Sequence, residues 1–218
     1  MKTWQWLALG GAAAFFLLRR GGGASASGAG AGALNITSGK DFFQLAQGDP
    51  RWASMLVGFS TKPESSMANV GCFFTSLVAT RNMLLGGSML PPEAMQLAKR
   101  AEAFQNDLLI LSTAARALGV SAPESERIRA NEEPVEKLRA KADDILRRHG
   151  IVIFNVGYNS TAPRHFIICN RRSANGYECM DVAGTKAHFM TLDPTSLQGQ
   201  RTASKRYITV GVAGVFRK

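Results

Sequence analysis

The sequence has few cysteines and few histidines, and these shortages exclude several classes of protein. Three cysteines among 218 residues are too few, and odd in number, for a disulfide framework. Cys169 and Cys179 each lack a second ligand two residues away, so no zinc-binding pattern is present and we expect no metal or cofactor. Cys169 lies in an apolar run that predicts burial, whereas Cys179 could face either way. No internal repeat is visible, which argues against a repeat architecture.

Acidic residues are also scarce, and the formal net charge is +10. Such a charge favours polyanionic partners: nucleic acid, anionic lipid or the acidic polymers of a cell envelope. The basic residues are scattered along the chain, and no nucleic-acid motif or interleaved aromatic platform accompanies them. Dedicated nucleic-acid binding is therefore not expected. The hydrophobic share of 45% is typical of a globular protein.

Residues 1–20 form a hydrophobic N-terminal segment, but its apolar run over residues 4–18 is shorter than the ~20 residues that cross a bilayer comfortably. As a signal peptide, the run would be followed by the small residues of Ala24-Ser25-Ala26. As a buried tail, it would belong to a larger assembly. Arg19 and Arg20 disfavour export of the side that follows the run. We therefore expect a retained helix that binds the membrane and a membrane-associated or cell-envelope location.

Residues 21–34 are nearly all Gly, Ala and Ser, a composition that predicts a flexible linker without core-forming side chains. The rest of the chain, residues 35–218, is long enough for one ordinary domain with its own core. The sequence thus divides into a hydrophobic segment, a linker and a single folded domain.

The hydrophobic periodicity of this domain changes from helical to strand-like midway along the chain. The first half predicts helices at Phe73 to Leu85, from Pro91-Pro92 to about Phe104, at Asp107 to Leu118 with Asn106 as cap, and between a cap at Asn131 and a stop at Gly150. The second half predicts strands at Ile151 to Val156, His165 to Cys169, Tyr177 to Asp181, Lys186 to Met190 and Arg206 to Val215. Helices followed by an antiparallel sheet indicate an α+β fold.

Cys72 is the most informative residue. It follows Val70-Gly71, where a turn-rich stretch gives way to the first predicted helix. The N-terminus of a helix favours a thiolate over a thiol through the helix dipole and the free N–H groups of the first turn. Burial as a small, inert hydrophobe is the alternative for this residue. Cys72 is therefore a candidate nucleophile.

His165 and Asp181 follow Cys72 in the order that a cysteine peptidase requires. His165 begins a predicted strand, where it could pair with Cys72 and protonate a leaving amine. Asp181 would hold the other ring nitrogen and fix the imidazole tautomer, although it could equally be an ordinary turn residue. His188, on the next predicted strand, is the rival base.

Three stretches together resemble a known family. They are Gln47-Gly48-Asp49-Pro50-Arg51-Trp52, Gly71-Cys72 with Thr75-Ser76-Leu77, and His165-Phe166-Ile167-Ile168. In order and spacing, the chain from about residue 42 to residue 216 resembles the papain-like cysteine peptidases related to bacteriocin-leader processing enzymes. The resemblance implies a papain-like fold, with a nucleophile helix on a small antiparallel sheet that carries His165 and Asp181. It also implies that Gln47, or less favourably Gln44, donates an N–H to the oxyanion.

The sequence departs from the family pattern at two places. The bulky Phe73-Phe74 stands where small residues usually follow the cysteine, and Val182 follows Asp181 where the family often has proline. We interpret the chain as a cysteine peptidase or amidase that cleaves a peptide or the peptide part of peptidoglycan, at an envelope or in a phage virion. The alternative is a catalytically silent papain-like domain whose cleft Phe73-Phe74 fills and which serves as a structural or binding module. Acyl transfer through the same residues is a third possibility.

Overall fold

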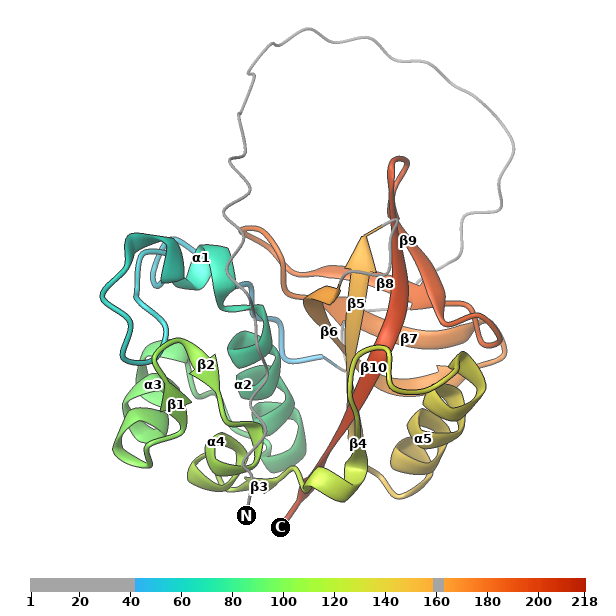
Figure 1. Ribbon diagram of the computed structural model, residues 1–218, viewed down its shortest axis with the longest axis horizontal. Coiled ribbons are helices and arrows are strands. Elements are labelled where there is room, and N and C mark those ends of the chain that lie inside the picture. Colours follow the sequence, from blue (N-terminus) through green and yellow to red (C-terminus); the bar gives the residue numbers. More distant parts are fainter. Residues whose placement is uncertain (1–41, 159–162) are drawn as a thin grey trace, which may run out of the picture.

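The computed structural model describes residues 42–158 and 163–218. It confirms the predicted α+β arrangement, with helices in the first half and an antiparallel sheet in the second (Figure 1). The helix predicted over residues 1–20 and the linker over residues 21–34 lie outside the described residues. Within the described ranges, no helix combines the length and apolar character needed to cross a membrane.

The helices lie mainly before residue 150 and the long strands after it. The helices are η2 (Pro63–Ser65), α1 (Met67–Val70), α2 (Cys72–Leu85), α3 (Pro91–Arg100), α4 (Leu111–Ala117), η3 (Glu124–Glu126) and α5 (Val135–Arg147). The short strands are β1 (Phe104–Gln105), β2 (Leu108–Leu109), β3 (Val120–Ser121) and β4 (Arg127–Ile128). The longer strands are β5 (Ile151–Tyr158), β6 (Pro163–Ser173), β7 (Gly176–Asp181), β8 (His188–Leu192), β9 (Gln198–Thr202) and β10 (Lys205–Arg217).

The main sheet runs in the order β3-β10-β5-β6-β7-β8, and β4 and β9 also pair with β10. All of these pairings are antiparallel. Figure 1 shows α2, α3 and α4 grouped on one side of the sheet and α5 on the other. Alternation along β5 explains the two layers: Ile153 joins the core beneath α2, whereas Phe154 joins the core beneath α5.

The prediction for the second and third helices is wrong between residues 101 and 110. Helix α3 ends at Arg100 rather than near Phe104, because Glu102 takes a left-handed φ of 54° and the chain then forms a hairpin. Asn106 is the left-handed turn residue of that hairpin, with φ of 57°, and does not cap a helix. Helix α4 begins only at Leu111.

Two further predictions need correction, and one strand was missed. Asn131 has a left-handed φ of 61° and lies before α5, which begins at Val135 after Pro134. The strand predicted from Lys186 is β8, which begins at His188. Strand β9 was not predicted, because its sequence is polar and does not alternate.

Phe74 allows a direct test of the core beneath α2. Its side chain is 1% exposed and its ring lies 5.6 Å from that of Phe104. We expect Phe74→Ala to lower the free energy of unfolding by about 3–5 kcal/mol, because it leaves a cavity in a packed core. Phe59, which is 51% exposed, provides the control, and Phe59→Ala should change stability by only about 0.5 kcal/mol. Equal effects in urea unfolding would contradict this packing.

Candidate active site

Cys72 is the first residue of α2, and Gly71 forms the sharp connection from α1. A Cβ atom on residue 71 would lie 2.5 Å from the Met67 carbonyl oxygen, so this connection requires glycine. The Cys72 side chain is 7% exposed. Because the first N–H groups of a helix have no acceptor within the helix, the Cys72 N–H is a candidate donor to an oxyanion beside its own sulfur.

The two phenylalanines after Cys72 pack within the protein. The Phe73 ring stacks on that of Phe166, with 4.1 Å between centroids and 17° between planes, while Phe74 points into the core beneath α2. The Ser76 hydroxyl also donates to the Phe166 carbonyl oxygen at 3.4 Å. Since Phe73 and Phe166 neighbour Cys72 and His165 in sequence, this packing holds the start of α2 against β6.

His165 lies near the start of β6, in register with Val156 of β5, and its side chain is 4% exposed. Its Nε2 atom lies 2.6 Å from Asp181 Oδ1. The Cys72 side chain interacts with this ring as well, and this interaction raises the pKa of His165. Because Nε2 faces Asp181, Nδ1 is the ring nitrogen left for the sulfur. The structure thus brings Cys72, His165 and Asp181 together.

The surroundings of His165 favour its protonated form. Burial lowers the pKa of His165, but hydrogen bonds to Asp181 and Cys72 outweigh burial and raise this pKa to about 10. At neutral pH the ring can therefore donate from both nitrogens, to the carboxylate through Nε2 and to the sulfur through Nδ1. An imidazolium so placed can stabilise a thiolate and later release a proton to a leaving group.

Asp181 is fully buried and accepts hydrogen bonds on both oxygens. Oδ1 accepts from the Ala183 N–H at 2.7 Å as well as from His165. Oδ2 accepts from the Tyr207 hydroxyl at 2.7 Å and from Nε of Arg201. Burial raises the pKa of Asp181, but hydrogen bonds from His165, Ala183 and Tyr207 hold it well below its usual range. Asp181 is therefore a fixed anion.

Arg201 and Tyr207 are parts of the site that the sequence did not reveal. Arg201 lies on β9, the strand that was not predicted, and its Nη2 also donates to the Ala183 carbonyl oxygen at 3.3 Å. Burial and the charge of Asp181 raise the pKa of Tyr207, so that its hydroxyl stays a donor. The Tyr207 ring also lies 5.8 Å from the His165 ring, at 27° between planes. These two residues bind Oδ2, the carboxylate oxygen that His165 does not contact.

Gln47 lies between the nucleophile and the carboxylate. Its backbone N–H donates to the Val182 carbonyl oxygen at 2.8 Å, next to Asp181. Its Nε2 donates to the Ala68 carbonyl oxygen at 2.7 Å, one turn before Cys72. A carboxamide nitrogen carries two N–H bonds, and the Ala68 carbonyl oxygen takes one of them. The Oε1 atom is buried and has no hydrogen-bond partner among the described residues.

His188, the rival base, is exposed on β8. It lies opposite Asp181 in the β7–β8 register, but the Asp181 carboxylate bonds the His165 ring. The contacts therefore favour His165 as the base. In the described part of the chain, no group of three or more His, Cys, Asp or Glu side chains could hold a metal ion.

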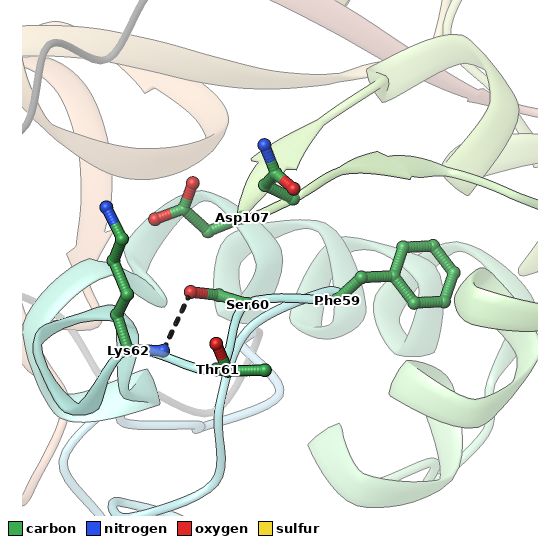
Figure 2. Close-up of a pocket in the computed structure, with 6 residues that line it drawn as sticks. Phe59, Ser60, Thr61, Lys62 and Asp107 are labelled. Carbon is green, nitrogen blue, oxygen red and sulfur yellow. Dashed lines mark hydrogen bonds between the residues drawn. The ribbon is translucent and has the colours of Figure 1, made fainter.

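A separate pocket of about 220 Å³ lies between the loop at Phe59–Lys62 and the turn at Asn106–Asp107 (Figure 2). The Asp107 carboxylate on its wall accepts a hydrogen bond from the Ser65 hydroxyl at 2.7 Å. None of the four predicted site residues lines it. The pocket is therefore distinct from the site around Cys72.

The coupling of His165 to Cys72 predicts a pH dependence. We expect His165 to titrate near pH 10 in the folded chain and at lower pH in Cys72→Ala, because the hydrogen bond and charge of Cys72 add to those of Asp181 in opposing burial. Because folding raises the pKa of His165 from 6.5, protonated His165 stabilises the folded chain. This stabilisation is fully present below pH 6.5 and is lost as pH rises through about 10. NMR titration of the ring measures the pKa, with Cys169→Ala as the control. An unchanged pKa in Cys72→Ala would contradict the contact.

Comparison with known proteins adds no assignment to this geometry. No family model matches the chain, and no curated protein or solved structure matches it either. What the site can do chemically follows from the contacts of Cys72, His165 and Asp181 themselves.

Proposed function

We propose that the chain is a cysteine peptidase or amidase with a papain-like arrangement, in which α2 presents the nucleophile to a sheet that carries the histidine and the aspartate. The observation that supports this proposal most strongly is the buried series Cys72–His165–Asp181, with His165 Nε2 2.6 Å from Asp181 Oδ1. A thiol, an imidazole and a carboxylate in this order form the set that nucleophilic acyl transfer requires.

Acylation begins with the Cys72 sulfur as a thiolate and His165 as an imidazolium. The sulfur adds to the carbonyl carbon of the scissile amide, and the carbonyl oxygen becomes an oxyanion. When the C–N bond breaks, Nδ1 of His165 gives its proton to the departing nitrogen, which leaves as a neutral amine. Asp181 keeps Nε2 protonated and oriented throughout.

Two donors would stabilise the oxyanion in this proposal. One is the Cys72 N–H at the start of α2. The other is the second N–H of Gln47 Nε2, whose first N–H is held by the Ala68 carbonyl oxygen. Removing one such donor typically costs on the order of 10²–10³ in turnover. Gln47 is thus a positioned donor in this proposal.

Deacylation reverses the roles. Neutral His165 takes a proton from water, the hydroxide adds to the thioester, and Cys72 leaves as a thiolate while His165 again carries the proton. The products are a carboxylic acid and an amine. An amine acceptor in place of water would give acyl transfer through the same thioester, so hydrolysis and transfer share this site.

The proposed substrate is an amide bond in a peptide or in the peptide part of peptidoglycan. The net charge of +10 would attract the chain to anionic envelope polymers or lipid. A membrane-associated location, or a place in a phage virion that acts at the envelope, accords with this charge and with the apolar run at residues 4–18.

The alternative of a catalytically silent module rested on the bulk of Phe73-Phe74. In the structure, Phe73 stacks on Phe166 and Phe74 lies in the core, so both rings serve packing between α2 and its neighbours. The silent module stays the alternative, because Cys72 and His165 are both buried, and the labelling experiment distinguishes the two.

Labelling with a peptide-based thiol electrophile tests the proposal. We expect one label on the native chain, at Cys72, because only this thiol lies beside an imidazolium. Cys72→Ala should abolish the label, and the matched variant Cys169→Ala should keep it. Labelling that survives in Cys72→Ala would refute Cys72 as the nucleophile.

A further inference from the structure

Cys169 and Cys179 lie opposite each other on neighbouring strands. Cys169 on β6 is the register partner of Cys179 on β7. Both thiols are buried, 0% and 1% exposed, in the core beneath α5. The Cys169 thiol donates to the Arg171 carbonyl oxygen at 3.3 Å, and the Cys179 thiol donates to the Tyr177 carbonyl oxygen at 3.4 Å. Cys72 belongs to the other core, beneath α2, so the three cysteines separate into a pair and a single residue.

This placement matches the geometry of a disulfide. Directly opposite residues of antiparallel strands have Cα atoms about 4.5–5.5 Å apart, within the range of about 4.4–6.8 Å that a disulfide spans. Opposite residues also point to the same face of the sheet, so the Cβ atoms face each other. In the structure both thiols are free, so a bridge needs only side-chain rotation at two positions that already face each other.

We propose that Cys169 and Cys179 form a cross-strand disulfide when the chain folds in an oxidising compartment, leaving Cys72 as the free thiol. The oxidant is a disulfide, of a small thiol or of a protein. One cysteine thiolate attacks it to give a mixed disulfide and a released thiolate. The second cysteine then displaces the other half. The chain loses two protons and two electrons, and the oxidant becomes two thiols.

The bridge forms during folding. Burial raises the pKa of the Cys179 thiol well above its ordinary value, so Cys179 in the folded chain presents little thiolate to a reagent. Once formed, the bridge leaves Cys72 as the one free thiol of the chain. An odd cysteine count thus accords with one bridge and one nucleophile. The proposal is independent of the peptidase activity, because it concerns the other core.

Refolding in a defined redox buffer tests the bridge. The full chain is unfolded with reductant and refolded in mild detergent, either with reduced and oxidised glutathione or with reduced glutathione alone. Free thiols are then alkylated and the chain is digested with trypsin. Cleavage after Arg171 and Arg172 separates the cysteines, so a bridge would join the peptides His165–Arg171 and Ser173–Lys186.

We expect the joined peptides only after oxidative refolding, with Cys72 alkylated, and a melting temperature about 5–10 °C above that of the reduced chain. Cys179→Ser should show neither the joined peptides nor the rise, whereas Cys72→Ser should show both. Alkylation of all three thiols in the folded, oxidised chain would overturn the proposal. So would a bridge that includes Cys72.

Discussion

Cys72→Ala is expected to reduce amide hydrolysis to the uncatalysed background, a loss on the order of 10⁴-fold or more, because no acyl-enzyme can form. The fold should persist, since the packing of Phe73 and Phe74 is untouched. Release of product from a model peptide and from a peptidoglycan fragment measures the first effect, and thermal unfolding measures the second.

Cys169→Ala is the matched control for this loss. This substitution also removes a buried thiol, but from the core beneath α5. The variant should therefore keep its turnover at temperatures below its melting temperature. Full activity in Cys72→Ala would show that another group attacks the amide. A loss of activity in both variants would indicate a stability effect instead of a chemical one.

Asp181→Ala should damage both activity and stability. Without the carboxylate, His165 loses the acceptor that fixes its tautomer, and we expect turnover to fall by on the order of 10²–10⁴-fold. Arg201 and the imidazolium then also face each other without a counter-charge. Breaking a buried pair in this way lowers the free energy of unfolding by about 3–5 kcal/mol. Kinetics and urea unfolding measure the two effects separately.

Asp181→Asn separates the two roles of this residue. Its amide oxygen can still accept from His165, so activity should fall less than in Asp181→Ala, whereas the ion pair with Arg201 is lost in both variants. His188→Ala is the second comparison and should leave turnover largely intact. If Asp181→Ala retained full activity while His188→Ala abolished it, the base would be His188.

Local sequence patterns predicted the elements that carry the site. The helix predicted from Phe73 is α2, which starts at Cys72, and the strands predicted at His165 and at Tyr177 to Asp181 lie within β6 and β7. These elements have strong hydrophobic periodicity and clear turn signals, which are local properties of the chain. The sequence alone therefore predicts which helix and which strands carry the three site residues.

Contacts that depend on long-range pairing could not be predicted in this way. Arg201 reaches Asp181 because β9 pairs with β10, and the polar sequence of β9 carries no periodic signal of a strand. Tyr207 lies on a predicted strand, but its hydrogen bond to Asp181 depends on strand order. Local sequence also fails to predict the structure at Asn106, because asparagine is common both as a helix cap and in a left-handed turn.

The most direct test of the account is the rate at which iodoacetamide alkylates each of the three thiols of the native, reduced chain near pH 6. The pairing of Cys72 with the His165 imidazolium predicts that Cys72 reacts roughly 100-fold faster than Cys169 and Cys179, and that His165→Ala removes this advantage. Equal rates for the three thiols, or a fast Cys72 that is indifferent to His165→Ala, would contradict the proposed nucleophile.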